Sequence, residues 1–550
     1  MDSPQHTLPI GPFQEGIWLF WRLNPASPAY NMPEIFYFDG DFDAKAAEFA
    51  FNETIRRHES LRTRFHETES GVMQVIDRDP EPVPVNVVDL RGLSAVMHTE
   101  RLESVLDAEA NVPFDLAAGP AVRLTAIQVS ESRTALVLVA HHIVCDGTSM
   151  AIVLHEFGEL YKSARRETPP DLGPIAPGYG TFVEEQLATL ADGGLEEESA
   201  YWRERLAGVT GSALPGTGHT AAHQPGALEV HAESTVLADS LAEAVSAYAR
   251  RARSTPFAVL LCAMEVMIAA ATGDGDVAVG TATSGRTPRF AGTVGMLANV
   301  VVARSRIDIA KSFATVLEAV SLDLMDAIDH QGLPFSRMVA ELHEAGLERG
   351  VELVRTMFAS GATGGLNLGE GTLSEVAART VDGPFDLSVA CYVESSGIAL
   401  DWEYALRTYS PEAARGYCAA YQEILALLLD QPDAAMDSLG LTEVLARVHP
   451  SARAAAPSPG AVSPAAEPGG PADAALTSVE AAVAAIWSEV LGVPIEAPHD
   501  DFFESGGHSM LASVAVASVR KKVSTTATLR MLFDHPQLRD FSSRLSTGSA

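Results

Sequence analysis

Two adjacent histidines stand close to an aspartate and a glycine in the stretch LVLVAHHIVCDGTSM, residues 136–150. A neutral imidazole can accept a proton from an attacking amine or hydroxyl group near neutral pH. Gly147 would let the backbone approach a developing oxyanion, and Asp146 would need a polar partner if it is buried. His141, His142, Asp146 and Gly147 are therefore candidates for acid–base chemistry at the end of an apolar segment.

The residues around the histidines indicate how they are positioned. Residues 136–139 are apolar and rich in valine, which predicts a buried strand. Asp146 and Gly147 predict a turn, and Thr148 or Ser149 would cap the helix that follows. Because successive strand residues point to opposite faces, only one histidine can line a given cavity if both extend the strand.

Three interpretations of this stretch remain open. No HExxH pattern or Cys/His cluster supplies further ligands, so a metal site is disfavoured and we predict no bound metal. Histidines at strand ends are often packed and hydrogen-bonded core residues, and the stretch alone supports that interpretation about as well as catalysis. A proton acceptor of suitable pKa next to a glycine favours catalysis.

A second candidate site lies near the carboxyl terminus, in the stretch DDFFESGGHSML. Gly506, Gly507 and His508 precede Ser509, where a helix is expected to begin. Glycine turns with a serine N-cap are common, and taken alone that structural interpretation is favoured. A helix N-terminus also favours an anion, so a phosphodiester on Ser509 would be well placed.

Composition limits the possible classes of partner. The 550 residues include 38 basic and 72 acidic side chains, and the resulting formal charge of −34 would repel nucleic acid and anionic membranes. Four widely spaced cysteines predict neither a disulfide framework nor a thiolate zinc site. With no signal peptide or membrane helix in the sequence, we expect a cytoplasmic protein.

Strand-like and amphipathic helical segments alternate through the first 445 residues, which predicts an α/β region. This region is too large for one core, so we expect two lobes, residues 1–175 and 176–445. Residues 446–477 form a linker, and its stretch rich in Ala, Pro, Gly and Ser, residues 451–477, could extend to about 90 Å. Residues 478–550 form a small helical unit with one apolar face on its first helix: Val479, Val483, Ile486, Trp487, Val490 and Leu491.

The first region resembles the condensation domains of nonribosomal peptide synthetases, which have a chloramphenicol-acetyltransferase-like fold. HHIVCDG is similar to their HHxxxDG signature, and RRHESLRTRF, from Arg56, looks like their second motif. The stretches SPAYNMP after Gln14 and Trp18, VGMLANVVVARSRI with Asn299, and DHQGLPFSRMV also resemble family segments, in the same order. The resemblance implies two acetyltransferase-like lobes with a tunnel between them.

The resemblance also implies roles for individual residues. His142 would be the active-site histidine that positions or deprotonates the acceptor amine. His141 and Asp146 would support it, Gly147 would complete the catalytic motif, and Asp146 would pair with Arg62.

The carboxyl-terminal unit resembles a peptidyl carrier, or thiolation, domain, a small all-α four-helix bundle. The match runs from Asp501 to Met510, and LRMLFDHPQLRDFSS looks like the closing segment of such domains. By this resemblance, Ser509 receives 4′-phosphopantetheine from coenzyme A through a phosphopantetheinyl transferase.

The order of the two domains implies a condensation–carrier didomain that forms an amide bond. An upstream donor carrier protein on another chain would supply the acyl or peptidyl thioester, and Ser509's arm would supply the amino acid. Only the linker separates the two domains, so an adenylation domain would load Ser509 in trans. Three alternatives stay open: an ester-forming, free-amine or acyl-coenzyme A acyltransferase, an inactive recruitment domain, and an epimerase on the same scaffold.

Overall fold

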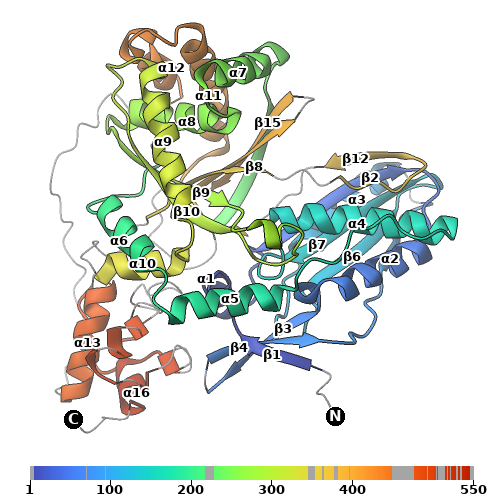
Figure 1. The fold of residues 1–550 in the computed structure, drawn as a ribbon, viewed down its shortest axis with the longest axis horizontal. Coiled ribbons are helices and arrows are strands. Elements are labelled where there is room, and N and C mark those ends of the chain that lie inside the picture. Colours follow the sequence, from blue (N-terminus) through green and yellow to red (C-terminus); the bar gives the residue numbers. More distant parts are fainter. Residues whose placement is uncertain are drawn as a thin grey trace.

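Figure 1 shows the computed structural model, two α/β lobes followed by a small helical unit. The structure describes residues 5–69, 71–92, 95–216, 228–344, 353–361, 365–376, 382–394, 397–448, 476–491, 493–502, 505, 515–516, 518–520, 522–524, 526–527, 531–532 and 535–545.

The amino-terminal lobe is built on a five-stranded sheet in the order β12-β2-β7-β6-β5. Its strands are β2 (Asn31–Asp39), β5 (Asn86–Asp89), β6 (Val122–Gln128), β7 (Arg133–His141) and β12 (Thr372–Val376). A separate sheet contains β1 (Gln5–Pro9), β3 (Thr63–Thr68) and β4 (Gly71–Asp77). β7 is buried from its second residue onward, which explains its continuous apolar sequence.

Helices contribute apolar side chains to the core of this lobe. They are α1 (Glu15–Leu23), α2 (Ala44–Arg57), α3 (Ala95–Asn111) and α4 (Gly147–Arg166). The carboxylate of Asp43 caps α2 by accepting hydrogen bonds from the backbone of residues 45 and 46. Ala47, Phe51 and Ile55 of α2 recur at helical spacing and are buried in the core of the lobe.

The carboxyl-terminal lobe has a seven-stranded sheet in the order β10-β9-β11-β14-β15-β8-β13. Its strands are β8 (Leu228–Val236), β9 (Asp276–Thr283), β10 (Asn299–Arg306), β11 (Thr356–Ser360), β13 (Asp382–Gly383), β14 (Leu387–Glu394) and β15 (Gly397–Ala405). Its helices are α6 (Glu196–Arg205), α7 (Asp239–Ala252), α8 (Pro256–Thr272), α9 (Phe313–Asp329), α10 (Phe335–Glu344), α11 (Pro411–Asp430) and α12 (Leu441–Ala446).

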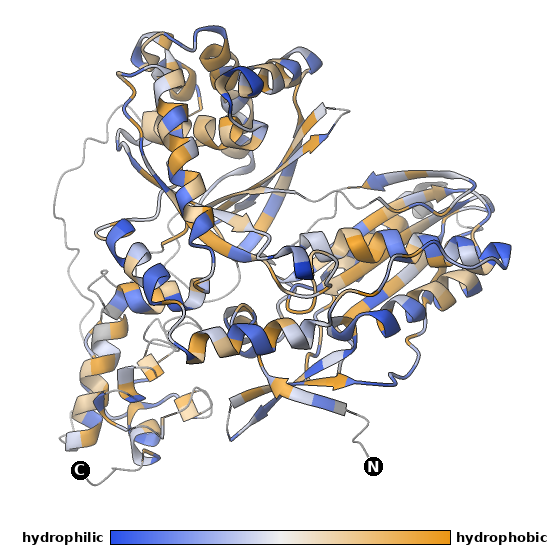
Figure 2. Ribbon diagram, in the orientation of Figure 1, coloured by the Kyte–Doolittle hydropathy of each residue, from blue (hydrophilic) through white to orange (hydrophobic). Residues whose placement is uncertain are grey.

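Helix α8 lies at the centre of this lobe and is apolar along most of its length (Figure 2). Thr255 caps it, Pro256 occupies its first turn, and Gly273 ends it in a left-handed conformation. Glu265 is fully buried in α8, and burial raises the pKa of its carboxyl group well above the usual range, while Ser305 acts in the opposite direction. The core therefore holds one carboxyl group that is protonated at neutral pH.

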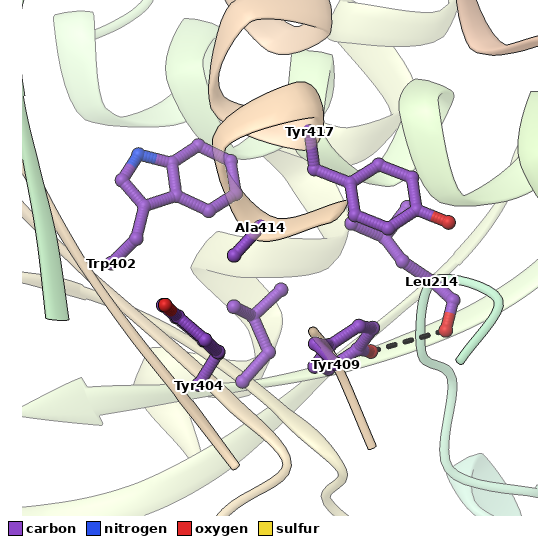
Figure 3. Close-up of a pocket in the computed structure, with 7 residues that line it drawn as sticks. Leu214, Trp402, Tyr404, Tyr409, Ala414 and Tyr417 are labelled. Carbon is purple, nitrogen blue, oxygen red and sulfur yellow. Dashed lines mark hydrogen bonds between the residues drawn. The ribbon is translucent and has the colours of Figure 1, made fainter. Parts of the chain in front are cut away.

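The two faces of β14 and β15 have different surroundings. One face carries Leu387, Trp402 and Tyr404, which pack against α11 around a cavity with space for about one water molecule (Figure 3). At its edge, the Tyr409 hydroxyl donates a hydrogen bond to the carbonyl of Leu214 over 3.1 Å. The other face carries partly exposed, more polar side chains, and so does not belong to this core.

Two segments of the later chain cross back to the amino-terminal lobe. The loop 284–298, here called the first bridge, places Phe290, Val294 and Leu297 in the amino-terminal core. Strand β12, here called the second bridge, pairs antiparallel with residues 35–39 of β2. Tyr179 of α5 (Tyr179–Ala191) is also buried in that core, although it lies beyond residue 175, so the predicted lobe boundary stays a prediction.

The carboxyl-terminal unit contains α13 (Ser478–Leu491) and α16 (Leu538–Ser543). A capping box starts α13, because Thr477 and Glu480 each bind the other's backbone N–H through their side chains. The Trp487 ring packs against Phe502 and Phe541 with centroids 5.1 and 5.5 Å away. The predicted apolar face of the first helix is confirmed, since all six of its residues belong to or pack against this core.

Among the described helices, none is by itself long and apolar enough to cross a membrane. Within the described ranges, one pair, α7 and α8, passes this test when the two helices are taken together, but they are bent by 103° and α8 is buried in the carboxyl-terminal core.

Candidate active site

The strand that carries the two histidines ends between them. β7 ends at His141, whose N–H donates to the carbonyl of Ala121, and His142 begins a turn. The N–H of His142 donates over 2.8 Å to the carbonyl of Tyr30, the residue before β2. The two side chains are thus separated by the turn as well as by strand alternation, and they have different surroundings.

His141 is buried and has a structural environment. Its Nδ1 accepts a hydrogen bond from the N–H of Ile143 over 3.2 Å, and Phe114 packs edge-on against its ring. Burial, followed by the charges of His142 and Arg123, lowers the pKa of His141 to about 3. His141 is therefore neutral at physiological pH and holds the turn that follows it.

His142 is less buried than His141, and the Tyr30 ring packs edge-on against it with centroids 6.3 Å apart. Burial lowers the pKa of His142, against the opposing effects of the Asp146 charge and of the backbone of His142 and Cys145. Its buried Nδ1 has no hydrogen bond of good geometry to the described residues. The ring is therefore neutral at pH 7, the state in which imidazole accepts a proton.

A side chain from the entry to α1 holds the turn after His142. The amide of Gln14, fully buried, donates from Nε2 to the carbonyl of Ile143 over 2.7 Å and accepts the N–H of Gly11 on Oε1. The sequence motif around Gln14 does not by itself predict this role. A polar amide within an apolar segment was the available signal, because a buried amide needs partners for both ends.

Asp146 joins the two lobes. Its carboxylate caps α4 by accepting the N–H of Ser149 over 2.8 Å, so the expected capping by Thr148 or Ser149 is wrong. The same carboxylate accepts two hydrogen bonds of 2.8 Å from Arg286 and one of 3.0 Å each from the N–H groups of Leu297 and Ala298. Asp146 thereby binds both ends of the first bridge.

The expected pairing of Asp146 with Arg62 is wrong. The guanidinium group of Arg62 donates a hydrogen bond to the backbone carbonyl of Asp77. Burial lowers the pKa of Arg62, and the charges of Glu59 and Asp77 partly raise it again. Arg286 takes the expected place, with a bidentate geometry that suits a carboxylate. Both side chains of this pair are almost fully buried, at 6% and 1% exposed for Arg286 and Asp146.

Gly147 is the first residue of α4, directly after the Asp146 cap. Two residues on, the hydroxyl of Ser149 donates to the carbonyl of Gly295 over 2.8 Å and accepts its N–H over 3.0 Å. Gly295 must remain a glycine, because a Cβ there would lie 2.1 Å from the Tyr179 ring. The helix start is thus held against the first bridge by side-chain and backbone contacts together.

Asn299, at the end of the first bridge, connects two segments noted in the sequence. Its amide donates to the carbonyls of Gln331 and Leu333 over 2.8 and 2.7 Å, and its Oδ1 accepts the N–H of Phe335. The DHQGLPF segment is therefore anchored to the start of β10.

Residues 506–514, which include Gly506, Gly507, His508 and Ser509, lie outside the described residues. The residues on either side are anchored: the N–H of Ser505 donates to the carbonyl of Asp501 over 2.9 Å, and Ala515 is fully buried. In the described part of the chain, no group of three or more His, Cys, Asp or Glu side chains is placed to hold a metal ion.

Comparisons with known proteins divide the chain in the same order. The family model "Condensation domain" matches residues 4–445, and "Phosphopantetheine attachment site" matches residues 481–545. A linear gramicidin synthase of Brevibacillus parabrevis is 30% identical over 80% of this chain, and chondramide synthase of Chondromyces crocatus is 34% identical over 61%. The chain spans only 9% and 8% of the length of these relatives.

Solved structures show the same fold. The first condensation domain of the calcium-dependent antibiotic synthetase has a TM-score of 0.69 at 21% identity, covering 79% of this chain and 99% of that one. The starter condensation domain of rhizomide synthetase has a TM-score of 0.69 at 20% identity, covering 78% and 97%. The chain therefore belongs to the condensation-domain family of nonribosomal peptide synthetases and carries a phosphopantetheine attachment domain behind its condensation domain.

Proposed function

We propose that this chain forms an amide bond between a donor acyl or peptidyl thioester and an amino acid carried on its own Ser509. The observation that carries this proposal is a neutral His142 on a turn fixed by Gln14 and His141, beside the contact between the lobes. An amine acceptor needs such a base, while the supporting residues keep it oriented.

His142 is proposed to act through Nε2, since its Nδ1 is buried. As the amine nitrogen attacks the donor carbonyl, the carbon–nitrogen bond forms and His142 takes the amine proton. The carbon–sulfur bond then breaks, and His142 returns the proton to the leaving thiolate. Asp146 does not contact the reacting atoms in this scheme; it holds the first bridge and the start of α4 in place.

The carrier domain explains where the acceptor comes from. When attached to Ser509, phosphopantetheine supplies a thiol at the end of a long arm that carries the amino acid. The linker keeps this arm at a high effective concentration near the condensation domain. The proposed partners are an upstream donor carrier protein, a phosphopantetheinyl transferase, and an adenylation domain in trans, because the two family matches are separated by only residues 446–480.

Intact-mass analysis tests this function. The phosphopantetheinyl transferase loads Ser509 directly from an aminoacyl-coenzyme A, and a donor carrier charged with an acyl thioester is added. We expect the acyl mass to move from the donor carrier to this chain, and the His142→Ala variant to slow transfer by about 10²–10⁴-fold.

Ser509→Ala is the matched control, which should stay unloaded and gain no acyl mass. Unchanged transfer by His142→Ala would refute the proposed base and favour an inactive recruitment domain. Acyl transfer to a free amine would instead identify one of the alternative acyltransferase reactions. Transfer to a hydroxyacyl group on Ser509 at the same rate as to the aminoacyl group would identify ester formation.

A further inference from the structure

The orientation of the His142 imidazole is not fixed through its buried Nδ1, which forms no hydrogen bond of good geometry with the described residues. Asp146 acts on His142 through its charge, whereas the hydrogen bonds of its carboxylate go to the start of α4 and to the first bridge. A general base is normally oriented by a third group. Without a hydrogen bond at Nδ1, that task falls to the side chains that pack against the ring.

The ring of Tyr30 lies against this imidazole. In the ladder between β2 and β7, Asn31 is opposite His141. The N–H of His142 donates to the carbonyl of Tyr30 over 2.8 Å, so these two residues form the next opposite pair. Opposite residues of an antiparallel ladder share a face, and the two ring planes meet at 79° with centroids 6.3 Å apart. Tyr30 therefore contacts His142 through both its backbone and its side chain.

Tyr30 is itself held in place by other parts of the amino-terminal lobe. The Phe20 ring of α1 packs against the Tyr30 ring at 80°, with centroids 5.1 Å apart. The next residue, Asn31, anchors the backbone, because its amide donates to the carbonyls of residues 110 and 112 over 2.9 Å each. The Tyr30 ring can therefore restrict rotation of the imidazole rather than follow it.

The Tyr30 side chain adds no charge beside the proposed base. Burial raises the pKa of its phenol group to about 12, so the phenol stays protonated over the range in which His142 is neutral. Loss of this side chain would therefore change the orientation of the imidazole without removing a charge from its surroundings.

We propose that Tyr30 is a positioning residue whose ring holds the His142 imidazole in the orientation in which Nε2 faces the acceptor nitrogen. This inference rests on the proposed amide-forming function and adds the side chain that orients its base. Helix α1 supports the arrangement at two points, through Gln14 and through Phe20. Because a rotated imidazole would still be neutral but would not meet the amine, kcat rather than substrate binding should depend on Tyr30.

Removal of the ring tests the proposal in the same acyl-transfer assay. Tyr30→Leu should lower kcat by about tenfold or more and change KM for the donor carrier by less than about twofold. Tyr30→Phe keeps the ring contact and should restore kcat to within about threefold of the wild-type value. The matched control is Tyr37→Leu, which removes a tyrosine of β2 whose ring lies 4.6 Å from the guanidinium carbon of Arg133, and it should keep the wild-type kcat.

A double-mutant cycle with His142 separates positioning from a general loss of structure. If Tyr30 acts through His142, Tyr30→Leu should slow transfer by less than about twofold in the His142→Ala background. If Tyr30→Leu does not fold, as judged by its melting curve, Phe20→Leu removes the support of the Tyr30 ring instead. Phe20→Leu should then lower kcat in the wild-type background and have no further effect in the His142→Ala background.

An unchanged kcat in Tyr30→Leu, or an equal loss of kcat in Tyr30→Phe, would overturn the positioning role while leaving amide formation intact. An equal effect of Tyr30→Leu with and without His142 would overturn it as well. Unchanged transfer by His142→Ala would instead refute the proposed base itself.

Discussion

Replacing Arg286 by methionine should strongly destabilise the protein. Arg286→Met leaves the carboxylate of Asp146, only 1% exposed, without its positive partner. Removing one member of such a buried pair costs about 3–5 kcal/mol, because the remaining charge stays in a low-dielectric environment. For lobes of this size each kcal/mol lowers the melting temperature by about 2–4 °C, so we expect a decrease of about 6 °C or more.

Arg62→Met is the matched control. It removes a hydrogen bond to one backbone carbonyl and should cost about 1 kcal/mol. A double-mutant cycle of Asp146→Asn with Arg286→Met, measured by urea unfolding and thermal melting, should show strong coupling between the two positions. The reasoning fails if Arg62→Met destabilises as much as Arg286→Met, or if the two changes in the cycle are additive within about 0.5 kcal/mol.

Three further predictions concern other buried polar groups. Gln14→Glu keeps the oxygen that accepts the N–H of Gly11 but removes the N–H that donates to the carbonyl of Ile143. In the acyl-transfer assay, kcat should therefore fall with little change in KM. A change confined to KM would contradict a positioning role for Gln14. Because the folded-state pKa of His141 is about 3, the unfolded chain binds the extra proton, and stability should fall as the pH decreases from 6.5, by up to about 1.4 kcal/mol per unit. His141→Gln should make the melting temperature depend less on pH below about 6.5. For Glu265, whose folded-state pKa is raised, stability should fall as the pH rises above 4.5, so Glu265→Gln should increase the melting temperature more at pH 8 than at pH 5; an equal increase would refute this assignment.

The sequence predicted the alternation of strands and helices, including the buried strand before His141 and the helix after Asp146, and the apolar face of α13, because these depend on local periodicity. It predicted that the two histidines differ, although the observed reason is the end of β7 at His141 as well as strand alternation. It did not predict Arg286 as the partner of Asp146, since 140 residues separate them and no local pattern reports such a contact. The cap was also assigned to the wrong residue, because Asp, Thr and Ser stand within four positions and all have suitable side chains.

The two bridges limit how the two lobes can move relative to one another. The lobes are connected at two separate places, at Asp146 and along residues 35–39 of β2. Neither lobe can therefore separate from the other, or turn far about one of these connections, unless the hydrogen bonds of the other connection break.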